Sequence, residues 1–430
     1  MKKEMQEAPS AQLRSEPLPL EFPGVHHMGR EEIEAAARVL ERRSLFRYYG
    51  VDLQGEVEAF EAEFARAMGV RHALAVTSGT GALSTALAAL GVGPGQEVII
   101  PAYLWVSVAS AVVNQGAIPV LADIDDSFCM DPADVERKIG PRTAGVILVH
   151  MSGAPGDAPS LREITARHGI FLLEDCAQCV GGRIHGRAVG SFGDMGIYSF
   201  QMNKNMTAGE GGCVVTNDGR LYRRAFAAHD MGYPRDENGR LSFSDPDLCL
   251  WGKGVRMDEL RAAVLRVQLR KLPAITGRMR ASKWRIRAAL EGLPGLAFRR
   301  VIDPSGDTGC FLIMTFPDAA QARLVNEMTR ADGIRTHPQG ISNIVMTEWG
   351  LHIYWNIVSL VRRAGTGPSG FPWNLAENAG LGHDYGKGAC PRADDLFARS
   401  ILLPVPSCLT EQDEADIIAA FRKAVLALAD

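Results

Sequence analysis

The chain lacks the long apolar runs that a membrane span requires. Its 430 residues contain no stretch of about 18 consecutive apolar residues. The lysines at its start are followed by acidic residues instead of the apolar core of a secretory signal. The formal net charge is −4 and no basic cluster occurs, which argues against nucleic acid or an anionic membrane as the main partner. These absences favour a cytoplasmic protein.

A disulfide framework and a metal site are also missing. The eight cysteines are scattered and lie mostly in apolar contexts, which fits a reducing compartment. Cys176 and Cys179 have the CxxC spacing of redox centres and of half a zinc site. No second pair and no nearby pair of histidines completes such a site, so we expect neither a metal nor a redox role there.

The length and composition instead predict a globular protein with one large and one smaller domain. Hydrophobic residues make up 46% of the chain, which is enough for a sizeable core. From about residue 55, helical and strand patterns alternate, as in an α/β fold with a doubly wound, mostly parallel sheet. We divide the chain into a flexible N-terminal arm (1–22), a large α/β domain (23–277) and a small C-terminal α+β domain (278–430).

Individual elements follow from the periodicity of apolar residues. Apolar runs predict strands at residues 73–76, 98–100, 118–122, 145–149, 170–173, 212–216 and 309–316. Helical patterns predict helices at residues 56–68, 82–90, 258–272, 278–293, 319–331 and 410–428. Asp131 and Pro132 open one more helix, as N-cap and first helical residue. Residues 338–398 carry no readable pattern.

Two charged residues follow short apolar strands. Lys204 stands four residues after Phe200 and shortly before a Gly-Glu-Gly-Gly turn. A lysine held on such a loop can form a Schiff base with an aldehyde, because burial and nearby charge tune its amine. Asp175 ends another strand, at the edge where doubly wound sheets bind ligands. A carboxylate there can keep a pyridine nitrogen protonated, although an aspartate at this position could equally be a helix N-cap.

Ser78, Gly79 and Thr80 lie between a strand and the start of a helix. Backbone N–H groups and hydroxyls at a helix N-terminus can hold a phosphate. An ordinary serine N-cap with a glycine turn gives the same pattern. Together with Asp175 and Lys204, however, this triplet offers partners for a phosphate, a pyridine nitrogen and an aldehyde. These are the three groups of pyridoxal 5′-phosphate.

Three further residues could complete such a site. Trp105 follows a strand end and could stack on the pyridine ring, or could instead belong to the core. Gln178 lies about one helical turn beyond Asp175 and could reach the phenolic oxygen of the cofactor. Ser199 precedes Lys204 at a spacing that lets its hydroxyl contact the phosphate.

The order and spacing of these motifs resemble the DegT/StrS-type sugar aminotransferases, which are fold-type-I pyridoxal-phosphate enzymes. The resemblance covers residues 30–275 and weakens in the C-terminal third. Its motifs are residues 77–83, 101–105, 119–125, 149–153, 174–178, 190–194 and 199–212. It implies that Lys204 carries the cofactor, that Asp175 pairs with the pyridine nitrogen, and that Gln178 contacts the phenolic oxygen. It also implies that Trp105 stacks on the ring and that Gly79, Thr80 and Ser199 hold the phosphate.

The resemblance further implies a homodimer with shared active sites. In this family an asparagine of the partner subunit, within an Asn-aromatic-Arg-Met run, usually completes the phosphate site. The corresponding run here consists of Gly254, Val255, Arg256 and Met257, so the asparagine is absent.

The implied reaction is a ping-pong transfer of an amino group from L-glutamate or L-glutamine to a ketone on a sugar, cyclitol or related polyhydroxylated compound. Gln201 stands where many nucleotide-sugar members have histidine, and is similar to members that act on free cyclitol ketones or aromatic-precursor sugars. Residues 45–50, 125–134 and 306–312 instead resemble transaminases that make an 8-amino octulosonate. Candidate substrate-pocket residues are Tyr48, Tyr49, His150, Arg187, Tyr233 and His337.

Other readings of the chain remain open. Sugar dehydratases related to this family have a histidine at the lysine position, so Lys204 argues against that reaction. A cofactor-binding sensor without turnover would keep the same binding residues, and the absent asparagine leaves that reading open. An oxidoreductase without pyridoxal phosphate is disfavoured, because no G-x-G-x-x-G follows the first strand.

Overall fold

Short apolar strands build the larger of two main sheets. The computed structural model describes residues 12–236, 239–338 and 340–428. Within these residues, seven strands form one sheet in the order β1-β9-β8-β5-β4-β2-β3. The strands are β1 (His72–Val76), β2 (Glu97–Pro101), β3 (Ile118–Ala122), β4 (Thr143–Val149), β5 (Phe171–Asp175), β8 (Met195–Ser199) and β9 (Gly212–Thr216). From β8 to β3 all neighbours are parallel, whereas β9 runs antiparallel to both β1 and β8. The predicted mostly parallel sheet is confirmed.

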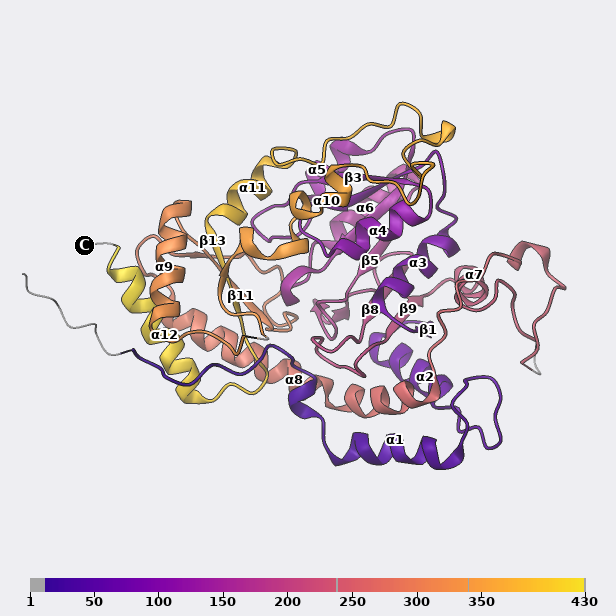
Figure 1. Ribbon diagram of the computed structural model, residues 1–430, viewed down its shortest axis with the longest axis horizontal. Coiled ribbons are helices and arrows are strands. Elements are labelled where there is room, and N and C mark those ends of the chain that lie inside the picture. The colour runs from indigo at the N-terminus through magenta and orange to yellow at the C-terminus, as the bar shows by residue number, and fades with distance from the viewer. Residues whose placement is uncertain (1–11, 237–238, 339, 429–430) are drawn as a thin grey trace, which may run out of the picture.

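Helices cover both faces of this sheet (Figure 1). Side chains of α3 (Gly79–Leu90), α4 (Val106–Asn114) and α7 (Gly219–His229) pack on one face. Those of α2 (Glu56–Met68) and α6 (Ala158–His168) pack on the other, together with the first half of α8 (Glu259–Leu290). Neighbouring residues of β4 alternate between the two cores, with Val146 in one and Ile147 in the other, so the strands must be apolar on both faces.

A smaller antiparallel sheet lies beside the first one. Among the described residues its strands have the order β10-β11-β13-β12. They are β10 (Ala297–Phe298), β11 (Phe311–Thr315), β12 (Ile344–Val345) and β13 (Ser400–Pro404). The helices α9 (Ala319–Ala331) and α12 (Glu411–Leu426) pack on it with the end of α8. Thr410 and Asp413 cap α12 reciprocally. The remaining α-helices and strands of the described residues are α1 (Arg30–Arg42), α5 (Pro132–Lys138), α10 (Val358–Val361), α11 (Pro391–Ala398), and the hairpin of β6 (Arg183–Ile184) and β7 (Arg187–Ala188).

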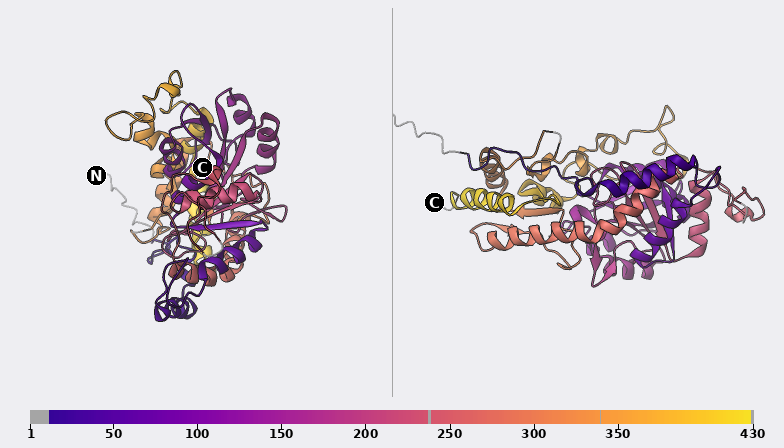
Figure 2. Two further views of the ribbon diagram at one scale, coloured as in Figure 1. Left: turned by 90° about the vertical axis from the view of Figure 1, so that its right-hand side faces the viewer. Right: turned by 90° about the horizontal axis from the view of Figure 1, so that it is seen from below.

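Helix α8 corrects one prediction from the sequence. Instead of two helices at 258–272 and 278–293, the structure has one continuous helix with Pro273 inside it. An interior proline usually destabilises a helix by about 3 kcal/mol. Here the first half is held against α1 and α2, and the second half buries Ile286 and Leu290 in the core of the small sheet. Packing on both sides therefore outweighs the break that proline favours, and α8 passes beneath both sheets (Figure 2).

The segment that the sequence left unassigned covers part of the large sheet. Residues 346–360 form short helical turns, and their buried side chains, including Trp349 and Tyr354, join the core between α3, α4 and the sheet. In Figure 1 the chain beyond α10 continues over the large domain before returning to α11. The boundary predicted at residue 278 stays a prediction, since it falls within α8 and the C-terminal residues pack on both sheets.

The predicted N-terminal arm is described only in part, because residues 1–11 lie outside the described residues. Beyond them the chain runs along the small sheet, where Leu18 is buried and its N–H donates to the Arg335 carbonyl over 2.8 Å. Arg14 pairs with Asp413 at 2.6 Å. In the described part of the chain, every helix is too short or too polar to cross a bilayer.

Candidate active site

A cavity of about 680 Å³ lies between the two sheets. Val149 and Asp175, the last residues of β4 and β5, line it from the large sheet, and residues 78–80 line it from the start of α3. Cys310 and Phe311 line it from the small sheet. In a parallel sheet the carboxyl ends of the strands open on one edge, and ligands bind there. The cavity thus occupies the position that the sequence analysis assigned to the site.

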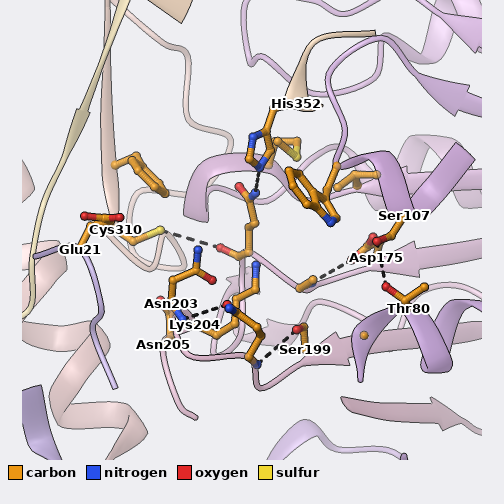
Figure 3. Close-up of a pocket in the computed structure, with 18 of the residues that line it drawn as sticks. Glu21, Thr80, Ser107, Asp175, Ser199, Asn203, Lys204, Asn205, Cys310 and His352 are labelled. Carbon is orange, nitrogen blue, oxygen red and sulfur yellow. Dashed lines mark hydrogen bonds between the residues drawn. The ribbon is translucent and has the colours of Figure 1, made fainter. Parts of the chain in front are cut away.

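Lys204 points into this cavity from a loop that is fixed at several points (Figure 3). Its N–H donates to the Gln201 carbonyl over 3.0 Å, and its own carbonyl accepts from the Gly24 N–H over 3.1 Å. The side chain of Asn205 is buried and donates to the Val180 carbonyl over 2.9 Å. Burial lowers the pKa of the Lys204 ammonium, and the charge of Asp175 opposes this shift only in part. A lowered pKa increases the fraction of neutral amine, which is the nucleophilic form.

Asp175 is buried at the end of β5 with one carboxylate oxygen left open. Oδ1 accepts from the Ala177 N–H over 2.9 Å, and no other hydrogen bond reaches this carboxylate from the described residues. Burial raises its pKa, while the Ala177 N–H and the charge of Lys204 act in the opposite direction. A buried carboxylate with one satisfied oxygen calls for a further donor or cation. A protonated pyridine nitrogen would meet that need.

The start of α3 forms a cradle that only a glycine permits. A Cβ at Gly79 would lie 2.8 Å from Cβ of Ser199, so the small residue lets the Ser199 hydroxyl approach the helix N-terminus. Thr80 and Ser107 bring two more hydroxyls together, with their Oγ atoms 2.8 Å apart. Ser78 is a helix N-cap, the alternative to a phosphate contact that the sequence also allowed, because its Oγ accepts from the Gly81 N–H at the start of α3. The free N–H groups and hydroxyls here fit a phosphate.

Gln178 and Trp105 both line the cavity, and both contact His352. The Gln178 amide lies 3.1 Å from Nε2 of His352, and its oxygen accepts from the Ser152 N–H over 3.0 Å. The indole of Trp105 is 43% exposed and lies against the His352 ring, with 4.7 Å between centroids. One face of the indole is therefore supported by protein while the side chain still borders the cavity.

Sequence reasoning missed several residues that line the cavity. These are Glu21, Ser107, Asn203, Cys310, Trp349 and His352. Glu21 is buried, and its Oε2 accepts from the Ile341 N–H over 2.8 Å. Trp349 and His352 come from turns within residues 338–398, where no periodic pattern marks them. The nearest signal in the sequence is the density of aromatic and histidine residues between 349 and 355.

The six predicted substrate residues do not line the cavity of this chain. His150 is fully buried: its Nδ1 accepts from the Gly156 N–H, and its Nε2 donates to Glu174 over 3.1 Å. Arg187 bonds to Ser191 on a hairpin. The other four lie elsewhere on the molecule and are Tyr48, Tyr49, Tyr233 and His337. The structure thus brings together the predicted cofactor residues but not the predicted substrate residues.

Cys176 and Cys179 are buried beside the site. Burial raises the pKa of both thiols well above the usual range, and this opposes the thiolate form that redox chemistry and metal binding need. The Cys176 sulfur also lies close to Glu174 and His150. The Glu174 carboxylate already accepts hydrogen bonds from the N–H groups of residues 190, 192 and 193.

These residues together fit pyridoxal phosphate. The open oxygen of Asp175, the amine of Lys204 and the cradle at Gly79 face one cavity. They would hold its pyridine nitrogen, its aldehyde carbon and its phosphate respectively. Gln178 and Trp105 would contact the ring.

Known proteins share both the sequence and the fold of this chain. The family model of the DegT/DnrJ/EryC1/StrS aminotransferases matches residues 27–341. A UDP-N-acetyl-3-dehydro-alpha-D-glucosamine 3-aminotransferase of Acidithiobacillus ferrooxidans is 34% identical over 376 residues, which are 86% of this chain and 89% of that protein. An L-glutamine:2-deoxy-scyllo-inosose aminotransferase of Micromonospora echinospora is 42% identical over 58% of this chain and 60% of that protein.

The crystal structure of 3-amino-5-hydroxybenzoic acid synthase matches with a TM-score of 0.78 and 28% identity, over 96% of this chain and all of that one. Sequence, fold and site geometry therefore agree. The chain belongs to the DegT/DnrJ/EryC1/StrS aminotransferase family and is a pyridoxal-phosphate-dependent aminotransferase.

Proposed function

We propose that this enzyme transfers an amino group from L-glutamate or L-glutamine to a ketone on a sugar, cyclitol or related polyhydroxylated ring. The observation that carries this proposal is the joint placement of Lys204, Asp175 and the Gly79 cradle on one cavity. The similar proteins act on keto-sugars and on a cyclitol, judged by their names. Gln201 also lines the cavity, and the resemblance noted in the sequence associates a glutamine at this position with free ring ketones.

The residues of the chain have distinct roles in such a transfer. When bound, pyridoxal phosphate supplies an electron sink for the pair left on the donor's α-carbon. Asp175 supports that sink by holding a positive charge at the pyridine nitrogen. The Nζ of Lys204, with its lowered pKa, takes the proton from the α-carbon of the donor and later returns one to the product. Donor and acceptor use the cavity in turn, which gives ping-pong kinetics.

A homodimer is part of the proposal. The described parts of two loops, residues 45–53 and residues 231–236 with 239–254, expose large apolar side chains, among them Trp251 at 95% and Phe243 at 84%. The two loops touch where Arg235 lies over the ring of Tyr48. Exposed aromatic groups of this size are typical of interfaces. The run at residues 254–257 contacts the first loop, where Arg256 lies over the Phe46 ring. It also borders the residues just before α3, since the Thr77 N–H donates to the Val255 carbonyl. A second subunit there would border the phosphate cradle, and sedimentation should give twice the mass of one chain.

We also propose that the enzyme works in the cytoplasm, because all eight cysteines are free thiols and reduced thiols persist there. Transfer to a keto-octulosonate is the second candidate acceptor reaction. Dehydration is disfavoured by Lys204. A non-catalytic sensor would bind the cofactor and leave every ketone unchanged.

Visible absorption of the purified enzyme with pyridoxal phosphate is the first test. Addition of L-glutamate or L-glutamine should bleach the yellow band, and the donor that bleaches it more effectively is the amino donor of the reaction. A panel of cyclitol ketones, keto-sugars and a keto-octulosonate should then restore the band with the true acceptor. A yellow band that neither donor bleaches would overturn the proposed transfer. A protein that does not turn yellow with pyridoxal phosphate would refute the assignment of this cofactor to the site.

A further inference from the structure

His352 enters the cavity from a part of the chain without recognisable motifs. It ends the short turn of residues 350–352 and borders the cavity (Figure 3). It contacts Gln178 and Trp105, the two predicted contacts of the cofactor ring. The family resemblance rests on residues 30–275 and assigns His352 no role. Its contacts, however, connect the C-terminal segment to the large domain at the site itself.

The hydrogen bonds around His352 run in one direction. The backbone N–H of Ser152 can only donate, so its partner 3.0 Å away must be the oxygen of the Gln178 amide. The NH₂ group of Gln178 therefore faces Nε2 of His352 at 3.1 Å and donates to it. Nδ1 of His352 carries the ring proton and faces the Trp349 carbonyl at 3.3 Å. This sequence of bonds fixes both the amide orientation and the tautomer of the imidazole.

The imidazole ring is also held between two indoles. Its centroid lies 4.2 Å from that of Trp349 and 4.7 Å from that of Trp105. Trp349 is buried and packs against Tyr103 and Phe311, so it provides a fixed support. The position of His352 thus limits the tilt of Trp105 as well as the rotation of the Gln178 amide.

Nearby charge and burial keep this histidine neutral. Burial lowers the pKa of His352 to about 3, and the positive charge of Lys204 acts in the same direction. Within the working pH range of an enzyme, Nε2 therefore stays a hydrogen-bond acceptor. A protonated ring would place an N–H against the NH₂ group of Gln178, and the bond would be lost.

We propose that His352 is a positioning residue for the cofactor: it holds the Gln178 amide with its second N–H available to the cavity, and it supports the indole of Trp105. This inference rests on the proposed function only in assuming that the cavity receives pyridoxal phosphate. It identifies a residue of the C-terminal segment as a part of the cofactor site.

The tautomer is tested without cofactor or substrate. The enzyme is labelled with ¹⁵N-histidine, and the His352 signals are assigned as those missing from the spectrum of His352→Gln. We expect a neutral ring protonated at Nδ1 that does not titrate between about pH 5 and 8, the range in which ordinary histidines do. A ring protonated at Nε2, or one that titrates in that range, would overturn the proposal.

Two substitutions then test the positioning itself. His352→Phe keeps a ring between the indoles but removes the acceptor, whereas His352→Gln can place an amide oxygen near the position of Nε2. We expect His352→Phe to weaken pyridoxal-phosphate binding about tenfold, the size of one buried hydrogen bond. It should also raise the pH midpoint of the visible band, because a donor to an anionic cofactor oxygen is lost. His352→Gln should stay within about threefold of the parent, and His168→Phe, on the exposed end of α6, is the matched control.

Parent-like cofactor affinity and band midpoint in a folded His352→Phe would overturn the inference. Should that variant not fold, the tautomer measurement still decides. If the parent enzyme aminates no ketone, but His352→Phe still weakens cofactor binding and raises the band midpoint, the proposed function is refuted and the inference stands. If the parent enzyme transfers amino groups normally, but His352→Phe changes neither cofactor affinity nor band midpoint, the inference is refuted and the proposed function stands.

Discussion

Two regions of the chain line the same cavity in different ways. In the large domain, Asp175 ends β5 and Lys204 stands on the loop after β8, so the order of the strands sets their positions. In the C-terminal segment, Trp349 and His352 sit on short turns whose position is set by side-chain packing. Residues of the large-domain kind can be predicted from local sequence, because the carboxyl ends of parallel strands lie at one edge of the sheet, where ligands bind. Those of the C-terminal segment become visible only in the folded molecule.

The largest expected effect is that of Lys204→Ala, which removes the one group that the large domain supplies for both nucleophilic and proton-transfer chemistry. We expect amino transfer to fall by at least about a thousandfold. Lys387→Ala, at an exposed lysine of the C-terminal segment, should leave activity unchanged. Steady-state assays with the best donor and ketone compare the two. Full activity in Lys204→Ala would refute the assignment of the site.

Asp175→Asn tests the charge at the end of β5 while its size is kept. We expect kcat to fall about a hundredfold, because the amide cannot hold a positive charge at the pyridine nitrogen. The unfolding of the cofactor-free protein should respond differently. The raised pKa of Asp175 favours the folded state at low pH, and this contribution is lost as the pH rises through that pKa. Calorimetric scans from acidic to neutral pH should show this loss in the parent and not in Asp175→Asn; equal slopes would contradict it.

Gly79→Ala tests the close approach at the phosphate cradle. The added Cβ would lie 2.8 Å from that of Ser199, so the serine or the helix start must shift. We expect affinity for pyridoxal phosphate to fall about tenfold, equivalent to one strong hydrogen bond. Gly277→Ala meets open space within α8 and should instead stabilise the fold by about 0.5–1 kcal/mol. Equilibrium binding and thermal unfolding separate the two glycines, and equal behaviour would mean that the cradle tolerates a side chain.

The smallest effect concerns the pH at which Lys204 becomes reactive. Burial lowers its pKa below the ordinary value of 10.5. The rate at which the cofactor-free protein takes up pyridoxal phosphate should therefore rise with pH, with a midpoint below pH 10.5. Stopped-flow absorbance across pH gives the midpoint. A midpoint at or above the ordinary lysine value would show that the cavity does not lower the pKa of the Lys204 amine.

The limits of sequence reasoning follow the same division. The strands at 145–149 and 170–173 were predictable because apolar residues on both faces leave few alternatives, and Asp175 followed from the second of them. Lys204 followed from another short apolar strand and from the glycine-rich turn after it. The antiparallel course of β9 was not, because strand direction depends on pairing with β1 and β8 rather than on composition. The continuity of α8 through Pro273 depends on two cores that are distant in sequence. His352 could not be predicted at all, since its partners in the large domain lie 174 residues away at Gln178 and still further at Trp105.

The single helix α8 also has a consequence for how the enzyme unfolds. It contributes to the cores of both sheets, and residues from 346 onward cover one face of the large sheet. Truncation near residue 278 would cut this helix and expose that face to water. Neither sheet should therefore be stable without the other, and heating should unfold both in one cooperative transition. In that sense the molecule is a single folding unit built around its catalytic cavity.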